Sequence, residues 1–432
     1  MLHDNYSINE KGHFAIGGCD TVELAKKYGT PLYVLDENKV RENVRMYVGT
    51  MKRCFTKNST IHYASKALSV KGIYRILSRE GAHADVVSLG ELYTAKAAGF
   101  DLKNAALHGN NKTDFDLESA VSEGVGEIVV DSFEELEKLD AIAGEMGKIQ
   151  PILLRVTPNI DCHTLKAIST GQLDSKFGTP IETGQAIKLA ELALEKKNLQ
   201  LLGFHCHCGS QVFDVQPFID QAQVMLNFMA DVKEKLGYEA SIIDLGGGFG
   251  VRYTENDPCI DIVKNIELIA DKVKSVCADK GLKMPDIIME PGRSIVAAAG
   301  VTLYTVGSVK EIAGYRTYVS VDGGMTDNPR YALYGSKYEA LIANKATAPK
   351  DLICTLAGRC CESGDLLGEN MEIQKAERGD ILAVLVTGAY NYSMASNYNR
   401  LPRPPVIMIK DGKPYVAVKR ESYEDITAND II

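Results

Sequence analysis

The amino-acid sequence predicts an α/β fold, a (β/α)8 TIM-type barrel, followed by an all-β domain that is a sandwich or a Greek-key barrel. Two observations carry this prediction. Between residues 60 and 293, eight short runs rich in β-branched residues alternate with helical stretches, and after residue 300 apolar residues recur with period two. Eight βα units within about 230 residues fit a closed barrel better than an open doubly wound sheet.

The predicted barrel elements follow one another with regular spacing. Strands are predicted at residues 61–66, 84–87, 105–108, 127–131, 151–156, 201–207, 241–245 and 286–290. Between them, segments such as 90–99, 183–197 and 217–237 place apolar residues three and four positions apart, which indicates amphipathic helices.

The second domain consists of strands around glycine-rich turns. Strands are predicted at residues 301–309, 317–324, 351–358 and 381–388, with a hairpin at 406–418. The Asp411-Gly412 pair in this hairpin is a strong turn signal. The strand-like segment 31–36 precedes the first barrel unit and is compatible with pairing in either domain.

Composition and charge narrow the class of protein. The 432 residues are 45% hydrophobic and 24% charged, and the net charge of −9 comes from interspersed acidic and basic residues. This pattern argues against nucleic acid or an anionic membrane surface as a partner. The weakly polar stretch 294–307 is too short to span a bilayer, and the first twelve residues lack a secretory pattern. We therefore expect a cytoplasmic protein whose ten cysteines are reduced thiols.

Titratable or glycine-rich residues stand at every predicted strand end, where a barrel enzyme carries its reacting groups. They are Lys66, Asp85, His108, Asp131, Arg155, His207, the run Gly246, Gly247 and Gly248, and Glu290 with Arg293. This many chemically active strand ends would be unusual in a barrel that served only as a scaffold.

The loops after the last two strands predict a phosphate site. The run DLGGGFG follows the seventh strand and EPGRS follows the eighth, and barrels frequently bind phosphate with these two loops. Glycines permit close backbone approach, although a strained turn alone would also explain them. Small apolar neighbours around Lys66 predict a partly desolvated amine suited to Schiff-base chemistry. A phosphate pocket with such a lysine suggests pyridoxal 5′-phosphate, with Glu290 on the pyridine nitrogen.

No metal site is predicted. In the segment His205 to Cys208, strand alternation places the two histidines on one face and the two cysteines on the other. His207 is then suited to stacking on a ring, whereas His205 is compatible with a packed core position. The two cysteines in RCCESGD match no zinc spacing.

In its ordered motifs the chain resembles the diaminopimelate decarboxylases, of the alanine-racemase-like (type III) group of pyridoxal-phosphate enzymes. The motifs are YASKA, DVVSLGEL, HGNNKT, SKFG, HCHCGSQ, GGGFG, EPGRSIV, VDGGMTDNPRYALY, CESGD and GAYNYSMASNYNRLPRPP. The resemblance covers nearly the whole chain. It implies a cofactor-binding barrel at residues 36–300, a β domain made of residues 1–35 with 301–432, and a homodimer with shared active sites.

The resemblance also implies the roles of individual residues. Lys66 would bind the cofactor covalently, and Cys361 from the partner subunit would donate a proton. The other expected cofactor-binding residues are Asp85, His207, Ser210, Gly246, Gly247, Gly248, Glu290, Gly292, Arg293 and Tyr390.

The expected reaction is decarboxylation of meso-2,6-diaminopimelate to L-lysine. Arg293, Arg330 and Tyr334 would bind the distal carboxylate of the substrate, and Glu362 would take the distal ammonium group. Tyr390 would also contact the substrate. Arginine suits a carboxylate because its planar fork can bind both oxygens. Alternatives are decarboxylation of ornithine, arginine or carboxynorspermidine, and a non-catalytic relative. The presence of Lys66 and Cys361 disfavours the latter, and the CESGD turn disfavours an amino-acid racemase.

Overall fold

The structure, a computed structural model, describes residues 1–160 and 174–432. Two compact units make up the chain. One contains Met1–Glu42, Val251–Pro258 and Ser294–Ile432, and the other contains Asn43–Gly250 and Cys259–Arg293.

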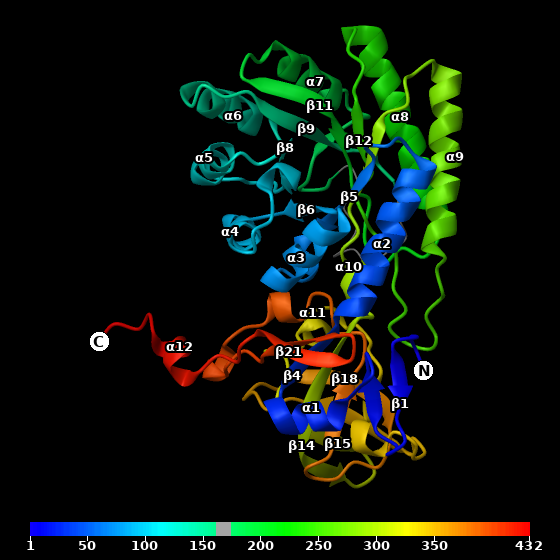
Figure 1. Ribbon diagram of the computed structural model, residues 1–432, viewed down its shortest axis with the longest axis vertical. Coiled ribbons are helices and arrows are strands. Elements are labelled where there is room, and N and C mark those ends of the chain that lie inside the picture. The colour runs from blue at the N-terminus through cyan, green and yellow to red at the C-terminus, as the bar shows by residue number, and fades with distance from the viewer. Residues whose placement is uncertain (161–173) are drawn as a thin grey trace. The chain divides into compact units, whose positions relative to one another are not determined.

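Eight parallel strands close into a barrel in the second unit, which confirms the predicted barrel class (Figure 1). They are β5 (Thr60–Ala64), β6 (His83–Val86), β7 (Ala105–Leu107), β8 (Glu127–Val130), β9 (Gln150–Thr157), β11 (Leu199–His205), β12 (Ile242–Asp244) and β13 (Asp286–Met289). The order is β9-β11-β12-β13-β5-β6-β7-β8, and pairing of β8 with β9 closes the ring. A two-residue strand, β10 (Thr179–Pro180), also pairs with β9.

Helices cover the outer side of these strands (Figure 1). They are α2 (Glu37–Cys54), α3 (Lys71–Glu80), α4 (Leu89–Ala97), α5 (Asp114–Glu123), α6 (Phe133–Glu145), α7 (Gln185–Glu195), α8 (Gln216–Leu236) and α9 (Ile262–Lys280). Hydroxyl caps start several of them: Ser88 accepts from the Glu91 amide and Ser132 from the Glu135 amide. These two caps fix the starts of α4 and α6, which begin three residues after the ends of β6 and β8.

The other unit is rich in antiparallel strands, as predicted for the β domain. Its main sheet has the order β18-β17-β15-β14-β4-β20-β21, and β19 pairs with both β14 and β16. The strands are β4 (Leu32–Asp36), β14 (Gly300–Ile312), β15 (Arg316–Val321), β16 (Ala340–Ile342), β17 (Leu352–Ala357), β18 (Leu366–Ile373), β19 (Ile381–Val384), β20 (Val406–Lys410) and β21 (Lys413–Val418). The segment 31–36 therefore pairs inside this unit, between β14 and β20.

The predicted hairpin is confirmed in its turn as well as in its strands. Strands β20 and β21 are joined by Asp411 (φ +50°) and Gly412 (φ +69°). Left-handed conformation at both central residues is what a two-residue hairpin turn of type I′ requires. Two short helices, α11 (Arg330–Tyr334) and α12 (Tyr423–Thr427), also belong to this unit.

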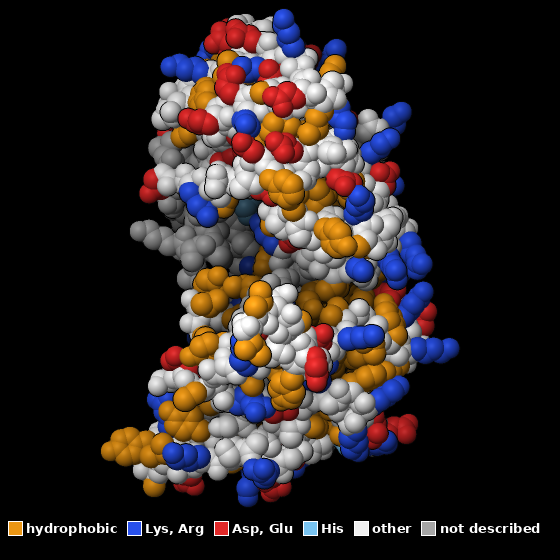
Figure 2. Space-filling view, turned by 90° about the vertical axis from the view of Figure 1, so that its left-hand side faces the viewer, with side chains coloured by type: hydrophobic (Ala, Val, Ile, Leu, Met, Phe, Trp, Pro, Cys, Tyr) orange, Lys and Arg blue, Asp and Glu red, His pale blue; other side chains and the backbone are white. Residues whose placement is uncertain are grey.

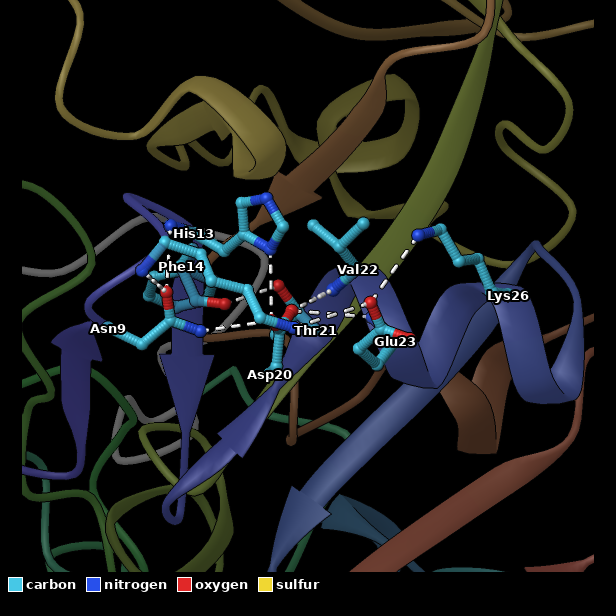
Figure 3. A network of polar contacts seen from close by, with 9 residues as sticks. Asn9, His13, Phe14, Asp20, Thr21, Val22, Glu23 and Lys26 are labelled. Carbon is cyan, nitrogen blue, oxygen red and sulfur yellow. Dashed lines mark hydrogen bonds and ion pairs between the residues drawn. The ribbon is translucent and has the colours of Figure 1, made fainter.

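A small N-terminal sheet, which the sequence did not predict, belongs to the same unit. It consists of β1 (Tyr6–Ile8), β2 (Phe14–Ile16) and β3 (Cys19–Asp20), followed by α1 (Thr21–Tyr28). Figure 3 shows that Asp20 is the centre of a network of polar contacts between this sheet and α1. One carboxylate oxygen of Asp20 accepts from the Val22 amide, and the other lies 2.9 Å from His13 Nδ1. Asp20 thus joins the small sheet to the start of the helix.

Lys, Arg, Asp and Glu side chains are interspersed over the face shown in Figure 2, in line with the mixed charge pattern of the sequence. Among the described residues, no helix combines the length and the apolar character needed to cross a membrane.

Candidate active site

The predicted strand-end residues of the barrel gather at the carboxyl ends of its strands. Lys66 follows β5, Glu290 follows β13, and these two strands are hydrogen-bonded neighbours. Strand β5 ends two residues earlier than predicted, because Ser65–Ala67 form a 3-10 turn. This turn places Lys66 at the end of the barrel wall.

Lys66 is exposed, whereas its small apolar neighbours predicted a partly desolvated amine. That part of the prediction is wrong for the isolated chain. Ala64, Ser65 and Ala67 are buried, but the Lys66 side chain within the same turn is exposed. An exposed amine at this place is accessible to an incoming aldehyde.

Glu290 lies between two buried histidines. His205 Nε2 is 3.2 Å from Glu290 Oε2, and His108 Nε2 is 3.1 Å from Glu290 Oε1. Asp85 Oδ1 lies 3.8 Å from the same His108 nitrogen. These four residues come from the ends of four different strands, and none of their side chains is more than 8% exposed.

Burial and mutual contact set the charges in this cluster. Burial would raise the pKa of Glu290, but the two imidazoles outweigh burial and hold that pKa well below its usual range. Burial lowers the pKa of His205 to about 4, so its ring is neutral near pH 7. For His108, the charges of Asp85 and Glu290 outweigh burial and raise the pKa. Glu290 is therefore favoured as a carboxylate, in contact with one neutral ring and with a second ring whose protonation the two carboxylates favour.

The three ligand atoms of His108, His205 and Glu290 lie within 4.8 Å of one another, a spacing that a metal ion also accepts. The neighbouring carboxylates favour a proton on His108, and a ring nitrogen that carries a proton is not a metal ligand. A second buried acid, Asp244, stands nearby, and burial together with the Glu290 charge raises its pKa well above the usual range.

His207 is fixed by the glycine run. The Gly247 amide donates to His207 Nδ1 at 3.3 Å, so the ring proton is assigned to Nε2. Burial, with the positive charge of Lys66, lowers the pKa of His207 to about 3. A neutral ring held in one orientation is suited to stacking on an aromatic cofactor.

The glycines allow three loops to meet closely. A Cβ atom at Gly247 would lie 2.0 Å from the Glu290 carbonyl oxygen, and one at Gly248 would lie 2.3 Å from the Gly209 carbonyl oxygen. Gly292 is similarly confined, 2.9 Å from the Ala64 Cβ atom. Larger residues at these positions would force the loops apart.

Beside these loops, Arg293 donates to Ser210 Oγ from Nη2 at 2.9 Å and from Nε at 3.3 Å. Arg293 is 6% exposed, so a guanidinium and a hydroxyl form a largely buried polar pair next to the glycine run. This donor set fits a phosphate group. Glu290 Oε1 is buried without a hydrogen bond of good geometry among the described residues, and it offers an acceptor for a pyridine N–H group. The residues present therefore fit pyridoxal phosphate.

In the β-rich unit, Arg330 is surrounded by aromatic rings. Its guanidinium carbon lies 5.4 Å from the ring centre of Tyr390 and 5.6 Å from that of Tyr334. Tyr390 has a φ of +62°, a conformation that non-glycine residues rarely adopt and that is concentrated at functional sites. These contacts orient a half-buried arginine fork and leave it suited to binding a carboxylate.

The CESGD turn exposes both of its predicted functional residues. Cys361 is exposed, and its backbone amide donates to Asn399 Oδ1 at 2.7 Å. Tyr398 donates to Glu362 Oε2 at 3.5 Å. The neighbouring Cys360 is half-buried, and burial raises the pKa of its thiol to about 12. Only the second thiol of the pair is thus presented to an outside group.

Comparison with known proteins gives one consistent result. Residues 40–297 match the model of the pyridoxal-dependent decarboxylase family, pyridoxal-binding domain. A diaminopimelate decarboxylase from Bacillus methanolicus is 48% identical over 420 residues, which cover 97% of each chain.

Solved structures agree with that comparison. A diaminopimelate decarboxylase from M. jannaschii, crystallised with L-lysine, aligns with a TM-score of 0.92 at 36% identity, covering 100% of this chain and 99% of its own. A lysine/ornithine decarboxylase from Vibrio vulnificus complexed with cadaverine aligns with a TM-score of 0.74 at 25% identity, covering 90% and 96%.

Fold and site together define a pyridoxal-phosphate-dependent carboxy-lyase. The chain belongs to the pyridoxal-dependent decarboxylase family, and within it to the diaminopimelate decarboxylases.

Proposed function

We propose that this protein decarboxylates meso-2,6-diaminopimelate to L-lysine and carbon dioxide, acting at the D-configured end of the substrate. The observation that carries the proposal is that Lys66 and the carboxylate Glu290 follow two strands, β5 and β13, that are hydrogen-bonded neighbours in the barrel. Diaminopimelate decarboxylases that cover the full length of the chain support the choice of substrate.

The chemistry divides between the cofactor and the chain. Pyridoxal phosphate, when bound, supplies the electron sink that accepts the electron pair left by departing carbon dioxide. In our proposal Lys66 Nζ would bind the cofactor, Glu290 would accept a hydrogen bond from its pyridine nitrogen, and His207 would stack on its ring. The remaining proposed contacts to the cofactor are Asp85, Ser210, Gly246, Gly247, Gly248, Gly292, Arg293 and Tyr390.

Substrate selection falls to residues that recognise both charges of the distal end. Arg330 and Tyr334, with Arg293 and Tyr390, would bind the distal carboxylate, and Glu362 would bind the distal ammonium group. A diamine-type substrate such as ornithine carries only a cation there, so an arginine would have no partner. The aromatic contacts of Arg330 favour a substrate with a distal carboxylate.

The proposal also includes a homodimer with shared active sites, in which Cys361 of the partner subunit protonates the α-carbon after carbon dioxide leaves. The exposed position of Cys361 supports a role toward an outside group. A thiol that serves as a proton donor has to stay reduced, which supports a cytoplasmic location. We assign the two compact units as the cofactor-binding barrel domain and the β domain.

A product assay tests the substrate. Purified protein with saturating cofactor is offered diaminopimelate, ornithine, arginine and carboxynorspermidine, and carbon dioxide and amine products are measured. We expect release of carbon dioxide with L-lysine from diaminopimelate at the highest kcat/KM. Preference for ornithine or arginine would overturn the substrate assignment.

Lys66→Ala tests the role of the lysine. We expect this variant to lose both turnover and the absorption band of covalently bound cofactor near the visible edge. Lys71→Ala, at the start of α3, is the matched control and should keep both. A Lys66→Ala protein that retained the band and full turnover would refute the assignment.

A further inference from the structure

The interior of this barrel is polar where barrels are usually apolar. Large branched side chains normally fill the layers inside a (β/α)8 barrel. Here His62, Asp85, His108, His205 and Asp244 are all buried, on strands β5, β6, β11 and β12 and directly after β7. Burying so many polar groups costs free energy unless they form hydrogen bonds or ion pairs with each other or with a ligand.

Two of these groups contact Glu290 from different sides. His205 reaches Oε2 from β11, and His108 reaches Oε1 from the end of β7. In the barrel order, neither β7 nor β11 is adjacent to β13, which carries Glu290. The three side chains therefore meet across the barrel interior and not along one sheet edge.

Both contacts are made through the Nε2 atom of the imidazole. A neutral ring at His205 can donate one hydrogen bond from Nε2 to the carboxylate. The His108 ring has a second carboxylate beside it, Asp85 at 3.8 Å, which favours the protonated form of that ring. His205 thus holds Oε2 by a hydrogen bond, while His108 attracts Oε1 as an ion-pair partner and leaves that oxygen an acceptor for the pyridine nitrogen. Rotation of the carboxylate would break both contacts.

On this basis we propose that His108 and His205 are positioning residues that hold Glu290 ionised and in one orientation toward the pyridine nitrogen of the cofactor. The proposal rests on the proposed function, because it presumes that pyridoxal phosphate binds with its ring nitrogen at Glu290. Asp85 acts one step further away, by favouring the charged form of His108.

Because His205 contacts Glu290 through Nε2, two amide substitutions distinguish this contact from a role of the ring in packing. The amide nitrogen of glutamine can take the place of Nε2, whereas the amide of asparagine is shorter and takes the place of Nδ1. We therefore expect His205→Gln to preserve the contact with Glu290 and His205→Asn to lose it. Both substitutions remove the ring, so a role of the imidazole in packing alone would affect them equally.

The readout is the protonation of the pyridine nitrogen, followed by NMR of protein loaded with nitrogen-15-labelled pyridoxal phosphate. We expect the protonated-nitrogen resonance in the wild type and in His205→Gln. In His205→Asn and His108→Asn it should shift toward the unprotonated position, with about tenfold or greater loss of kcat at little change in KM. His83→Asn is the matched control, since His83 contacts the ring of His62 and not Glu290.

Different results of this experiment would overturn the proposed function and the proposed role of the two histidines. A wild-type protein that forms no covalent adduct with the cofactor would overturn the proposed function. A protonated nitrogen in wild type, His205→Asn and His108→Asn alike would overturn only the inference. Equal shifts in His205→Gln and His205→Asn would also overturn it, because they would indicate a role of ring volume. If an asparagine variant does not fold, His205→Gln still decides, since loss of the protonated resonance in that variant contradicts the proposal.

Discussion

Arg330 shows how a single side chain is prepared for its ligand. Its guanidinium lies against two tyrosine rings, and Nη2 donates to Ser336 Oγ at 3.3 Å. These contacts restrict the rotamers of a long side chain before any carboxylate arrives. A lysine would retain the charge but would lose the planar fork and the stacking.

Replacing this arginine should therefore reduce substrate binding without disturbing the cofactor. We expect Arg330→Ala to cost about 2–5 kcal/mol in kcat/KM for diaminopimelate, as for loss of one partner of a desolvated ion pair. Arg330→Lys should recover only part of this loss. The absorption spectrum of the bound cofactor should not change in either variant. A spectrum that changed together with kcat/KM would assign Arg330 to the cofactor instead.

At the scale of elements, helix starts carry defined polar contacts. Asp20 caps α1, accepting from the Val22 amide at 2.9 Å and the Glu23 amide at 3.3 Å. Burial acts to raise the pKa of Asp20, but hydrogen bonds from His13, Asn9 and the Glu23 amide outweigh burial and lower it. The folded state therefore favours the charged form of this carboxylate, which makes its contribution to stability dependent on pH.

Loss of this cap should weaken the β-rich unit. We expect Asp20→Ala to lower the free energy of unfolding by about 0.5–2 kcal/mol, and Asp20→Asn to lower it less because asparagine still caps. The folded pKa lies below the unfolded value near 3.8, so the contribution is complete above that pH and is lost as pH falls through the folded pKa. Urea unfolding of the wild type and both variants at pH 7 and at pH 3 measures this. An equal difference between the wild type and the Asp20→Ala variant at both pH values would contradict the charge argument.

The sequence predicted elements inside the repeating βα pattern well and the short N-terminal strands outside it poorly. All eight barrel strands and the 406–418 hairpin are found. Strands β7 and β12 have only three residues each, but their place between helical stretches in the alternating pattern identifies them. Strands β1 to β3 have only two or three residues, too few to show a period. The end of β5 was misplaced because a 3-10 turn at Ser65–Ala67 has no periodic signature.

Site prediction shows the same limit at the scale of the whole molecule. Strand-end position was enough to single out Lys66 and Glu290. It could not show that His108 and His205 meet at Glu290, since that contact depends on three strands that are not neighbours in the barrel. The spacing of His205 and His207, two residues apart, was the available sign that both side chains lie on one strand face. From it, only His207 was predicted to contact the cofactor.

The largest-scale prediction concerns the proposed dimer. If each active site takes Lys66 from one subunit and Cys361 of the partner subunit, Lys66→Ala and Cys361→Ala proteins are both impaired alone but complement each other. A hybrid dimer then has one site with both residues and one site with neither. After equal mixing and subunit exchange, half of the dimers are hybrids, so about a quarter of wild-type activity should return. Activity is measured as L-lysine formation before and after exchange, with each variant alone as the control. No recovery in a mixture shown to contain hybrids would mean that both residues act within one subunit, or that Cys361 does not act in the reaction.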